Sequence, residues 1–131
     1  TKINLKDNLF NLKDNIVVFK PPETLIKAGY DSDIALIKRV IGIPGDKIEV
    51  KDGNLYLNDQ IQNKFITDKN INYSIGPVIV PENSLWVMGD NRNNSLDSHV
   101  WGPLPYKKII GRAFFRYWPL NHFGPIYFPA A

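Results

Sequence analysis

Residues 88–102, MGDNRNNSLDSHVWG, concentrate side chains that could do hydrolytic chemistry. Within five positions they include Ser95, Asp97 and His99, the residue types of a serine hydrolase triad. In an extended strand these residues would lie about 7 Å apart per step, which is too far for direct hydrogen bonds. A loop this rich in asparagine is also poorly suited to hold an imidazole dry and aligned. A self-contained triad is therefore not favoured.

Two interpretations of this segment remain open. Asparagine and serine side chains often hydrogen-bond their own backbone in turns, which would make it an ordinary polar loop. Its polar side chains are unusually dense, however, and they include Asn91 and Arg92 directly after an apolar strand. Folds commonly present functional groups on such loops. Under this second interpretation, the loop orients a reactive group of another segment without reacting itself.

The second candidate for chemistry is Lys38, which lies in the apolar run IALIKRVIGI at residues 34–43. A lysine in such a run is commonly solvated, or lays its aliphatic stem along the surface. Lys38 and Arg39 are adjacent, however, so a strand directs them to opposite faces and we expect one of them to be buried. Burial lowers the pKa of an amine, and a neutral lysine is a competent general base.

The elements that would position these residues are mainly strands. Short apolar or alternating runs predict strands at residues 15–19, 33–43, 78–80, 85–88 and 108–118. Residues 47–58 predict a hairpin, because Asp52-Gly53 suits the two positive-φ positions of a type I′ turn. Gly42 and Gly111 are expected at bulges, and one short helix is expected at residues 22–30. Many short strands with few helices indicate a mainly β fold, either a sandwich or a coiled, partly closed sheet.

Composition excludes several classes of protein. The 131 residues are 44% hydrophobic and 22% charged, which indicates a folded domain, and the length suits a single domain over 1–131 with a polar insertion at about 59–76. The net charge of +3 comes from dispersed residues, so no basic run argues for nucleic acid. Without cysteine, thiolate catalysis, thiolate metal sites and disulfides are excluded. No apolar run approaches the roughly 20 residues of a membrane span.

Two motifs resemble conserved boxes of the type I signal peptidases: IKRVIGIPGD at residues 37–46 and GDNRNNSLDSHVWG at residues 89–102. These enzymes are membrane-anchored serine endopeptidases that use a Ser/Lys dyad. NIVVF at 15–19 and GRAFFRYWPL at 111–120 resemble further family segments, although Asn15 stands where the family usually has an aspartate. Details of the motifs resemble the cyanobacterial and plastid branch. The resemblance implies a coiled, partly closed antiparallel sheet of the signal-peptidase and repressor-protease type.

The resemblance also implies roles for individual residues. Lys38 would be the general base, and Ser95 would be the serine whose hydroxyl hydrogen-bonds that lysine and orients it. Asp97 would brace the loop. The family often pairs this aspartate with an arginine at the position that His99 occupies here. The pair would then be weaker and sensitive to pH near neutrality.

Further residues would support this base. Arg39 and Asp90 match a second ion pair of the family, which would let Lys38 turn inward while Arg39 turns away. Asn91 and Arg92 would support the same loop from within the motif.

Leu36 and Ile37 match positions that line the family's pockets for small substrate side chains. The implied reaction removes signal peptides from translocated preproteins after Ala-x-Ala-type sites, with no metal or organic cofactor. The implied partners are preprotein signal peptides and the membrane surface, with no nucleic acid. The parent would be anchored in a plasma, inner or thylakoid membrane with its catalytic domain on the extracytoplasmic side. The aromatic tail at residues 114–128 could pack as core or contact that membrane.

One family feature is not found in the sequence. The family's nucleophile lies in a Ser-Met-x-Pro-type motif upstream of the IVVF strand, whereas the only methionine here is Met88 and no serine precedes Ser32. We therefore expect the chain alone to be inactive and to derive from a longer, N-terminally anchored parent that carries the nucleophile. Two alternatives stay open: a catalytically inactive homologue with a binding or assembly role, and a repressor-type self-cleaving Ser/Lys protease domain.

Overall fold

The computed structural model describes residues 9–67, 69–113 and 126–127. Residues 114–118 of the predicted last strand and most of the aromatic tail lie outside these ranges. In chain order the described elements are η1 (Leu9–Leu12), β1 (Ile16–Phe19), α2 (Glu23–Lys27), β2 (Ile34–Gly42), β3 (Lys47–Lys51), β4 (Asn54–Leu57), β5 (Gln60–Ile61), β6 (Ile75–Ile79), β7 (Ser84–Met88), η2 (Arg92–Asn94), α3 (Ser98–Trp101), β8 (Leu104–Pro105), η3 (Tyr106–Lys108), β9 (Ile109–Ala113) and β10 (Ile126–Tyr127).

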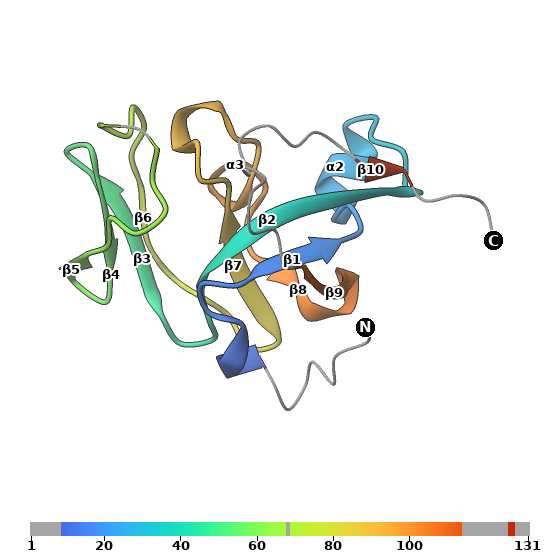
Figure 1. Cartoon of the computed structure of the whole chain (residues 1–131), viewed down its shortest axis with the longest axis horizontal. Helices are drawn as coiled ribbons and strands as arrows, with labels where there is room; N and C mark the ends of the chain where they lie inside the picture. The colour runs from blue at the N-terminus through green and yellow to red at the C-terminus, as the bar shows by residue number, and fades with distance from the viewer. Residues whose placement is uncertain (1–8, 68, 114–125, 128–131) are drawn as a thin grey trace.

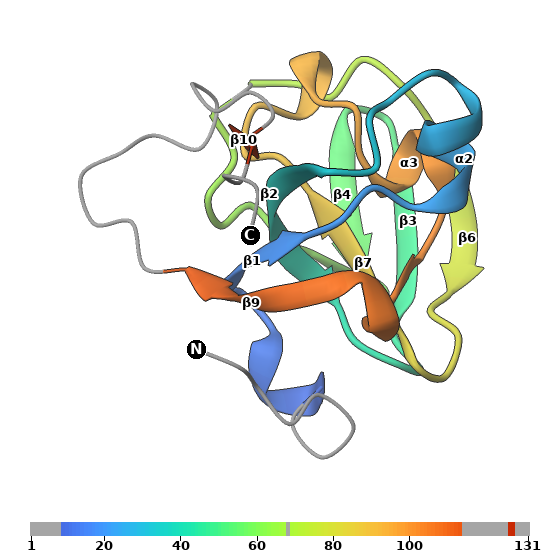
Figure 2. The same cartoon turned by 90° about the vertical axis from the view of Figure 1, so that its right-hand side faces the viewer.

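The described strands form two open antiparallel sheets, which confirms the prediction of a mainly β protein. One sheet has the order β8-β7-β2-β1-β9, with β10 paired to β2, and the other has the order β5-β4-β3-β6. Figure 1 shows the β3–β4–β6 sheet to one side of the long strand β2. Figure 2 shows β9 running alongside β1, so a late segment closes against the first strand.

Strand β2 is the centre of the first sheet. It pairs with β1 from Leu36 to Arg39 and with β7 from Arg39 to Gly42. The register shifts between Val40 and Gly42, which confirms the predicted bulge. A Cβ on Gly42 would lie 2.8 Å from the Cδ1 atom of Ile48, so a larger residue would push into the packing beneath. A second register shift lies opposite Gly111, between Val18 and Phe19 of β1.

The predicted β3–β4 hairpin is confirmed with its turn. Asp52 and Gly53 have φ angles of 51° and 82°, the positive values that a type I′ turn requires. Alternation along the two strands places their apolar side chains on one buried face. These are Ile48, Val50, Leu55 and Leu57.

Two apolar cores lie on opposite faces of β2 and β7. Val40 and Val87 belong to the first core, together with residues of η1, β1 and α2. Ile41 and Trp86 belong to the second core, which the hairpin covers. Because successive residues of a strand point to opposite faces, both strands need apolar residues on both faces where they meet the two cores. This explains the apolar runs in the sequence, which Lys38 and Arg39 interrupt in β2.

Two short α-helices are present in the described part of the chain, one more than predicted. Helix α2 lies within the predicted range 22–30 and is followed by Gly29 at φ 107°. The unpredicted helix α3 begins after Asp97, whose side chain accepts a hydrogen bond from the backbone N–H of His99 as an N-cap. A four-residue helix has no detectable hydrophobic period, so pattern alone could not reveal it.

Candidate active site

Lys38 lies at the middle of β2, and alternation places it on the same face as Leu36 and Val40. Both neighbours belong to the first core. The Nζ atom of Lys38 donates a hydrogen bond of 2.9 Å to the Oγ atom of Ser95, a residue 57 positions later in the chain. The amine is therefore flanked by apolar side chains and meets a hydroxyl of the loop that follows β7.

The Gly89 peptide unit fixes that hydroxyl. Its N–H donates to Ser95 Oγ at 3.1 Å and to Asp97 Oδ2 at 3.1 Å, and its carbonyl accepts from Arg92 Nε at 2.8 Å. A Cβ at position 89 would lie 2.3 Å from Ser95 Oγ. Only glycine allows this close approach, so Gly89 sets the position at which Ser95 meets Lys38.

Burial lowers the pKa of the Lys38 amine, because desolvation penalises the charged form; the negative charge of Asp97 acts in the opposite direction and raises it. Desolvation is the larger of the two effects. The balance favours a neutral amine at a lower pH than for a solvated lysine. A neutral amine can accept a proton, which is what a general base must do.

Asp97 is fully buried, and its side chain hydrogen-bonds Gly89 and His99, which are close to it in the chain. Its Oδ1 atom accepts the N–H of His99 at 3.1 Å and also contacts His99 Nδ1. Ser95, in contrast, is bonded to Lys38 and Gly89. The hydrogen bonds recorded for the described residues thus separate Ser95 from His99, and the three residues do not form a triad.

Arg39 forms the ion pair with Asp90 that the resemblance implied. Its Nε and Nη2 atoms donate to the two carboxylate oxygens of Asp90, each at 2.9 Å. Its Nη1 atom donates to the carbonyl of Asp14 at 3.0 Å, and its guanidinium lies 3.8 Å from the ring centroid of Phe65. The Arg39 side chain is only 13% exposed.

The expectation that one of the two adjacent cations is buried is therefore incomplete, because both are largely covered. Neither face of β2 is open to solvent at this pair of residues. The first core covers Lys38, and Phe65, with the carboxylate of Asp90, covers Arg39.

Arg92 lies wholly inside the loop, with none of its surface exposed. Its Nε atom bonds the Gly89 carbonyl, while its two terminal nitrogens have no hydrogen-bond partner among the residues the structure describes. Burial lowers the pKa of this guanidinium, and the charges of Asp90, Tyr73 and Asp97 counteract that effect. Asn91 begins the turn η2, where its carbonyl accepts the N–H of Asn94 at 3.1 Å.

The loop between β5 and β6, described for residues 62–67 and 69–74, was not predicted to contribute to the site. It contacts the loop after β7 at several points. Thr67 donates from its N–H and its Oγ1 to the carbonyl of Asp90, at 3.1 and 3.3 Å. The ring of Tyr73 stacks on the ring of His99, with centroids 3.9 Å apart and planes 8° apart. The hints in the sequence were two aromatic residues, Phe65 and Tyr73, in a mostly polar stretch.

Leu36 and Ile37, the predicted substrate contacts, are both buried. Leu36 packs in the first core, and Ile37 belongs to neither of the two cores described above. Leu36, Ile37 and Lys38 pair with β1 along one side. No strand in the described ranges pairs with their other side, since β10 pairs with Ala35 and Ile34 and β7 begins its pairing at Arg39.

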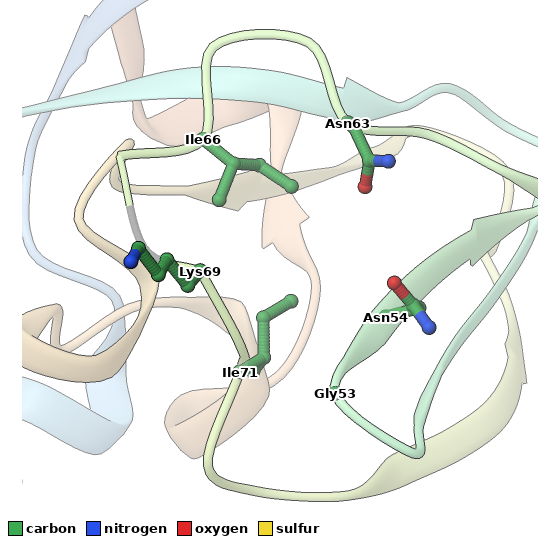
Figure 3. Close-up of a pocket in the computed structure, with 6 residues that line it drawn as sticks. All are labelled: Gly53, Asn54, Asn63, Ile66, Lys69 and Ile71. Carbon is green, nitrogen blue, oxygen red and sulfur yellow. The ribbon is translucent and has the colours of Figure 1, made fainter.

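A polar pocket of about 230 Å³ lies away from these residues, between the β3–β4 turn and the β5–β6 loop (Figure 3). Its lining residues are Gly53, Asn54, Asn63, Ile66, Lys69 and Ile71. None of the predicted site residues lines it. Among the residues placed by the structure, no group of three or more histidine, aspartate or glutamate side chains is arranged to hold a metal ion. No helix in these ranges is long and apolar enough to cross a membrane.

Fold and site together define a class: a mainly β domain organised around a desolvated lysine that bonds a serine of a glycine-anchored loop. The chain belongs to the signal peptidase family, because the family profile described as "Signal peptidase, peptidase S26" matches residues 9–118.

Similar proteins agree with this assignment. The chain is 50% identical over 105 residues to the probable thylakoidal processing peptidase 2, chloroplastic, of Arabidopsis thaliana, a match that covers 80% of this chain and 29% of that protein. It is 48% identical over 113 residues to the probable signal peptidase I-1 of Synechocystis, covering 86% of this chain and 57% of that protein. The chain thus spans between about a third and somewhat over half of these relatives.

The fold is also found in a crystal structure of a signal peptidase I from Enterococcus faecalis. The TM-score is 0.61 at 23% sequence identity, with 78% of this chain and 95% of that chain covered. At this identity the match supports the fold. The relatives confirm the resemblance to the cyanobacterial and plastid branch that the motifs suggested.

Proposed function

We propose that this chain is the base-bearing part of a type I signal peptidase, an endopeptidase that removes signal peptides with a Ser/Lys dyad. The observation that carries the proposal is the Lys38–Ser95 contact of 2.9 Å within a largely apolar setting. A lysine so placed loses solvation, and its hydrogen bond to a fixed hydroxyl holds the amine in one orientation.

In the proposed reaction, the neutral Lys38 amine removes the proton of a serine nucleophile. The family's nucleophile lies in a Ser-Met-x-Pro-type motif, which these 131 residues do not contain, so the proposal requires a parent protein that supplies this serine. The serine oxygen attacks the scissile carbonyl, the peptide C–N bond breaks, and the new amino group takes the proton from Lys38. Lys38 then takes a proton from water, and the water oxygen attacks the acyl ester. The bond between the acyl carbon and the serine oxygen breaks, and the serine oxygen takes the proton back from Lys38, which restores the free enzyme. Ser95 orients the base throughout.

The substrate is proposed to bind as an added strand. Among the described residues, no strand pairs with the second side of Leu36, Ile37 and Lys38, which lies directly beside the base. An extended cleavage segment pairing there would bring its scissile bond towards Lys38. We expect small residues at the first and third positions before the cut, of the Ala-x-Ala type.

The preproteins and the membrane are proposed partners. The relatives are named as thylakoidal processing peptidases and bacterial signal peptidases, which supports a membrane-anchored parent with this part on the extracytoplasmic side. Because signal peptides are held in the bilayer after translocation, the substrate would reach the enzyme at the membrane surface.

The test is cleavage of a preprotein by the complete protein that carries this chain, in lipid vesicles and in detergent. We expect Lys38→Ala to abolish cleavage. Ser95→Ala should lower turnover by roughly 10- to 100-fold, less than the roughly 100- to 10,000-fold contribution of a general base, because Lys38 itself remains. The control is Lys47→Ala, which removes a lysine of an exposed ion pair on β3 and should leave cleavage unchanged.

Substantial cleavage by the Lys38→Ala protein would overturn the assignment of the base. The unaltered complete protein could also fail to cleave although the pKa of Lys38 is lowered. That result would favour a catalytically inactive homologue with a binding role.

A further inference from the structure

We propose that Tyr73, on the β5–β6 loop, is a positioning residue of the active site: it stacks on His99 and holds that ring against Asp97, which shares the Gly89 N–H with Ser95. This inference rests on the proposed role of Lys38 as the base. It extends the site to a loop that the sequence marked only as a polar insertion.

The contacts form a continuous path. The Tyr73 ring lies parallel to the His99 ring, with centroids 3.9 Å apart. His99 Nδ1 contacts Asp97 Oδ1, and Asp97 Oδ2 accepts the Gly89 N–H at 3.1 Å. The same N–H donates to Ser95 Oγ, which accepts from Lys38 Nζ. Every link is a direct contact between named atoms or rings, and each is held by a buried or partly buried group.

Tyr73 is itself held in place by the hydrogen bonds of its neighbours. The N–H of Asn72 donates to Asn93 Oδ1 at 2.7 Å, and Asn93 Nδ2 donates to the carbonyl of Asn70 at 2.8 Å. Together with the bonds from Thr67 to the Asp90 carbonyl, these contacts attach the β5–β6 loop to the loop after β7 at both Thr67 and residues 70–72. The stack is thus part of an ordered interface between the two loops.

The path matters because Asp97 is a buried negative charge that acts on Lys38. We assign the donor role in their contact to His99 Nδ1, because an ionised carboxylate only accepts hydrogen bonds. That donor draws the charge of Asp97 away from Lys38 and favours the neutral amine. The stacked Tyr73 ring covers His99, whose side chain is 14% exposed, and keeps water from replacing it.

Other charged groups face this arrangement from neighbouring elements. Arg92 of η2 interacts electrostatically with both Tyr73 and Asp97, and Asp90 follows β7. Lys38 faces it from β2. None of these groups occupies the contact between His99 and Asp97, so loss of the stack would leave that contact open to solvent.

The experiment replaces Tyr73 in the complete protein by alanine, leucine or phenylalanine. Tyr73→Ala and Tyr73→Leu should move the acid limb of the pH profile of kcat/KM to higher pH by about half a unit or more, because the amine becomes easier to protonate. Tyr73→Phe keeps the stack and should restore the original profile. Leucine is included because it keeps much of the volume if the alanine protein fails to fold.

A second readout does not depend on cleavage. The rate at which Lys38 reacts with an amine-reactive reagent, followed against pH by mass spectrometry, reports the pKa of its amine. Tyr73→Leu should raise that pKa in step with the kinetic shift. The matched control is Tyr56→Leu on β4, where the Lys51 ammonium lies over the tyrosine ring. This substitution should leave the pKa of Lys38 unchanged.

A folded Tyr73→Leu protein with an unchanged labelling profile would overturn the proposal, as would a fall in turnover that is equal at all pH values. Tyr73→Phe behaving like Tyr73→Leu would also overturn it. If cleavage is absent in every protein, the proposed function fails, and the labelling profile still decides the role of Tyr73.

Discussion

At the scale of single residues, the site depends on what surrounds one amine. Lys38 would be an ordinary cation on a solvated strand, but Leu36 and Val40 on the same face belong to an apolar core. Ser95 would be an ordinary loop serine, but the Gly89 N–H and the absence of a Cβ at that glycine fix its hydroxyl beside the amine. The chemistry follows from these neighbours more than from residue type.

Burial of Lys38 also predicts how folding stability changes with pH. Its pKa is lowered in the folded state, so between that pKa and the ordinary value of 10.5 the unfolded chain binds more protons than the folded chain. Stability contributed by this group therefore rises with pH in that window and is lost as pH falls through it. The slope cannot exceed about 1.4 kcal/mol per pH unit for one group.

We therefore expect the free energy of unfolding of the original protein to rise relative to that of Lys38→Met between pH 7 and pH 10. Chemical denaturation at several pH values measures this difference. The same substitution at the exposed Lys107 should show a constant difference. A difference that is flat with pH for Lys38→Met would show that the amine is solvated.

At the scale of elements, the β5–β6 loop covers the face of β2 opposite the lysine. Phe65 adopts a φ angle of 63°, a conformation that is unusual for an aromatic residue. In this conformation its ring lies over the Arg39 guanidinium, which in turn holds both oxygens of Asp90. Asp90 directly follows Gly89, so the loop stabilises the peptide unit that anchors Ser95.

Phe65→Ala is expected to lower the free energy of unfolding by about 1 kcal/mol, the size of a cation–π contact at a partly exposed site. It should also speed amide hydrogen exchange at Gly89, because Arg39 and Asp90 lose their cover. Exchange followed by mass spectrometry or NMR measures this effect.

The control is Phe10→Ala in η1, a phenylalanine whose side chain is 65% exposed. It should leave exchange at Gly89 unchanged. Equal exchange at Gly89 in both variants and in the original protein would contradict a stabilising role for the β5–β6 loop.

At the scale of the whole molecule, β2 and β7 form a wall between two cores. Adjacent residues of each strand belong to different cores, as Val40 and Ile41 do in β2 and as Trp86 and Val87 do in β7. If β2 and β7 unfolded, both cores would lose side chains that pack in them. We therefore expect both cores to unfold together.

Tryptophan fluorescence can test this coupling, because Trp101 lies in the first core and Trp86 in the second. In a Trp118→Phe background, Trp86→Phe leaves a reporter of the first core and Trp101→Phe leaves a reporter of the second. In each variant, unfolding by denaturant should give the same midpoint by fluorescence and by far-UV circular dichroism. A reporter whose transition clearly precedes the loss of secondary structure would show that its core unfolds independently.

Local sequence determined a good part of this protein. The β3–β4 turn follows from Asp52-Gly53, which tolerate positive φ, and the bulge in β2 follows from Gly42. The apolar residues on both sides of Lys38 and Arg39 indicated a strand buried on both faces. The motifs that carry Lys38 and Ser95 indicated a family, and the structure places their side chains in contact across 57 positions.

Tertiary structure alone decided the rest. That Phe65 lies over Arg39 and that Tyr73 stacks on His99 both depend on where the β5–β6 loop packs. Most residues of this loop are polar and its few apolar residues follow no period, so its sequence carries little information about its partners. Their positions follow from hydrogen bonds and ring contacts with residues far away in the chain, and such contacts exist only once the two sheets have assembled.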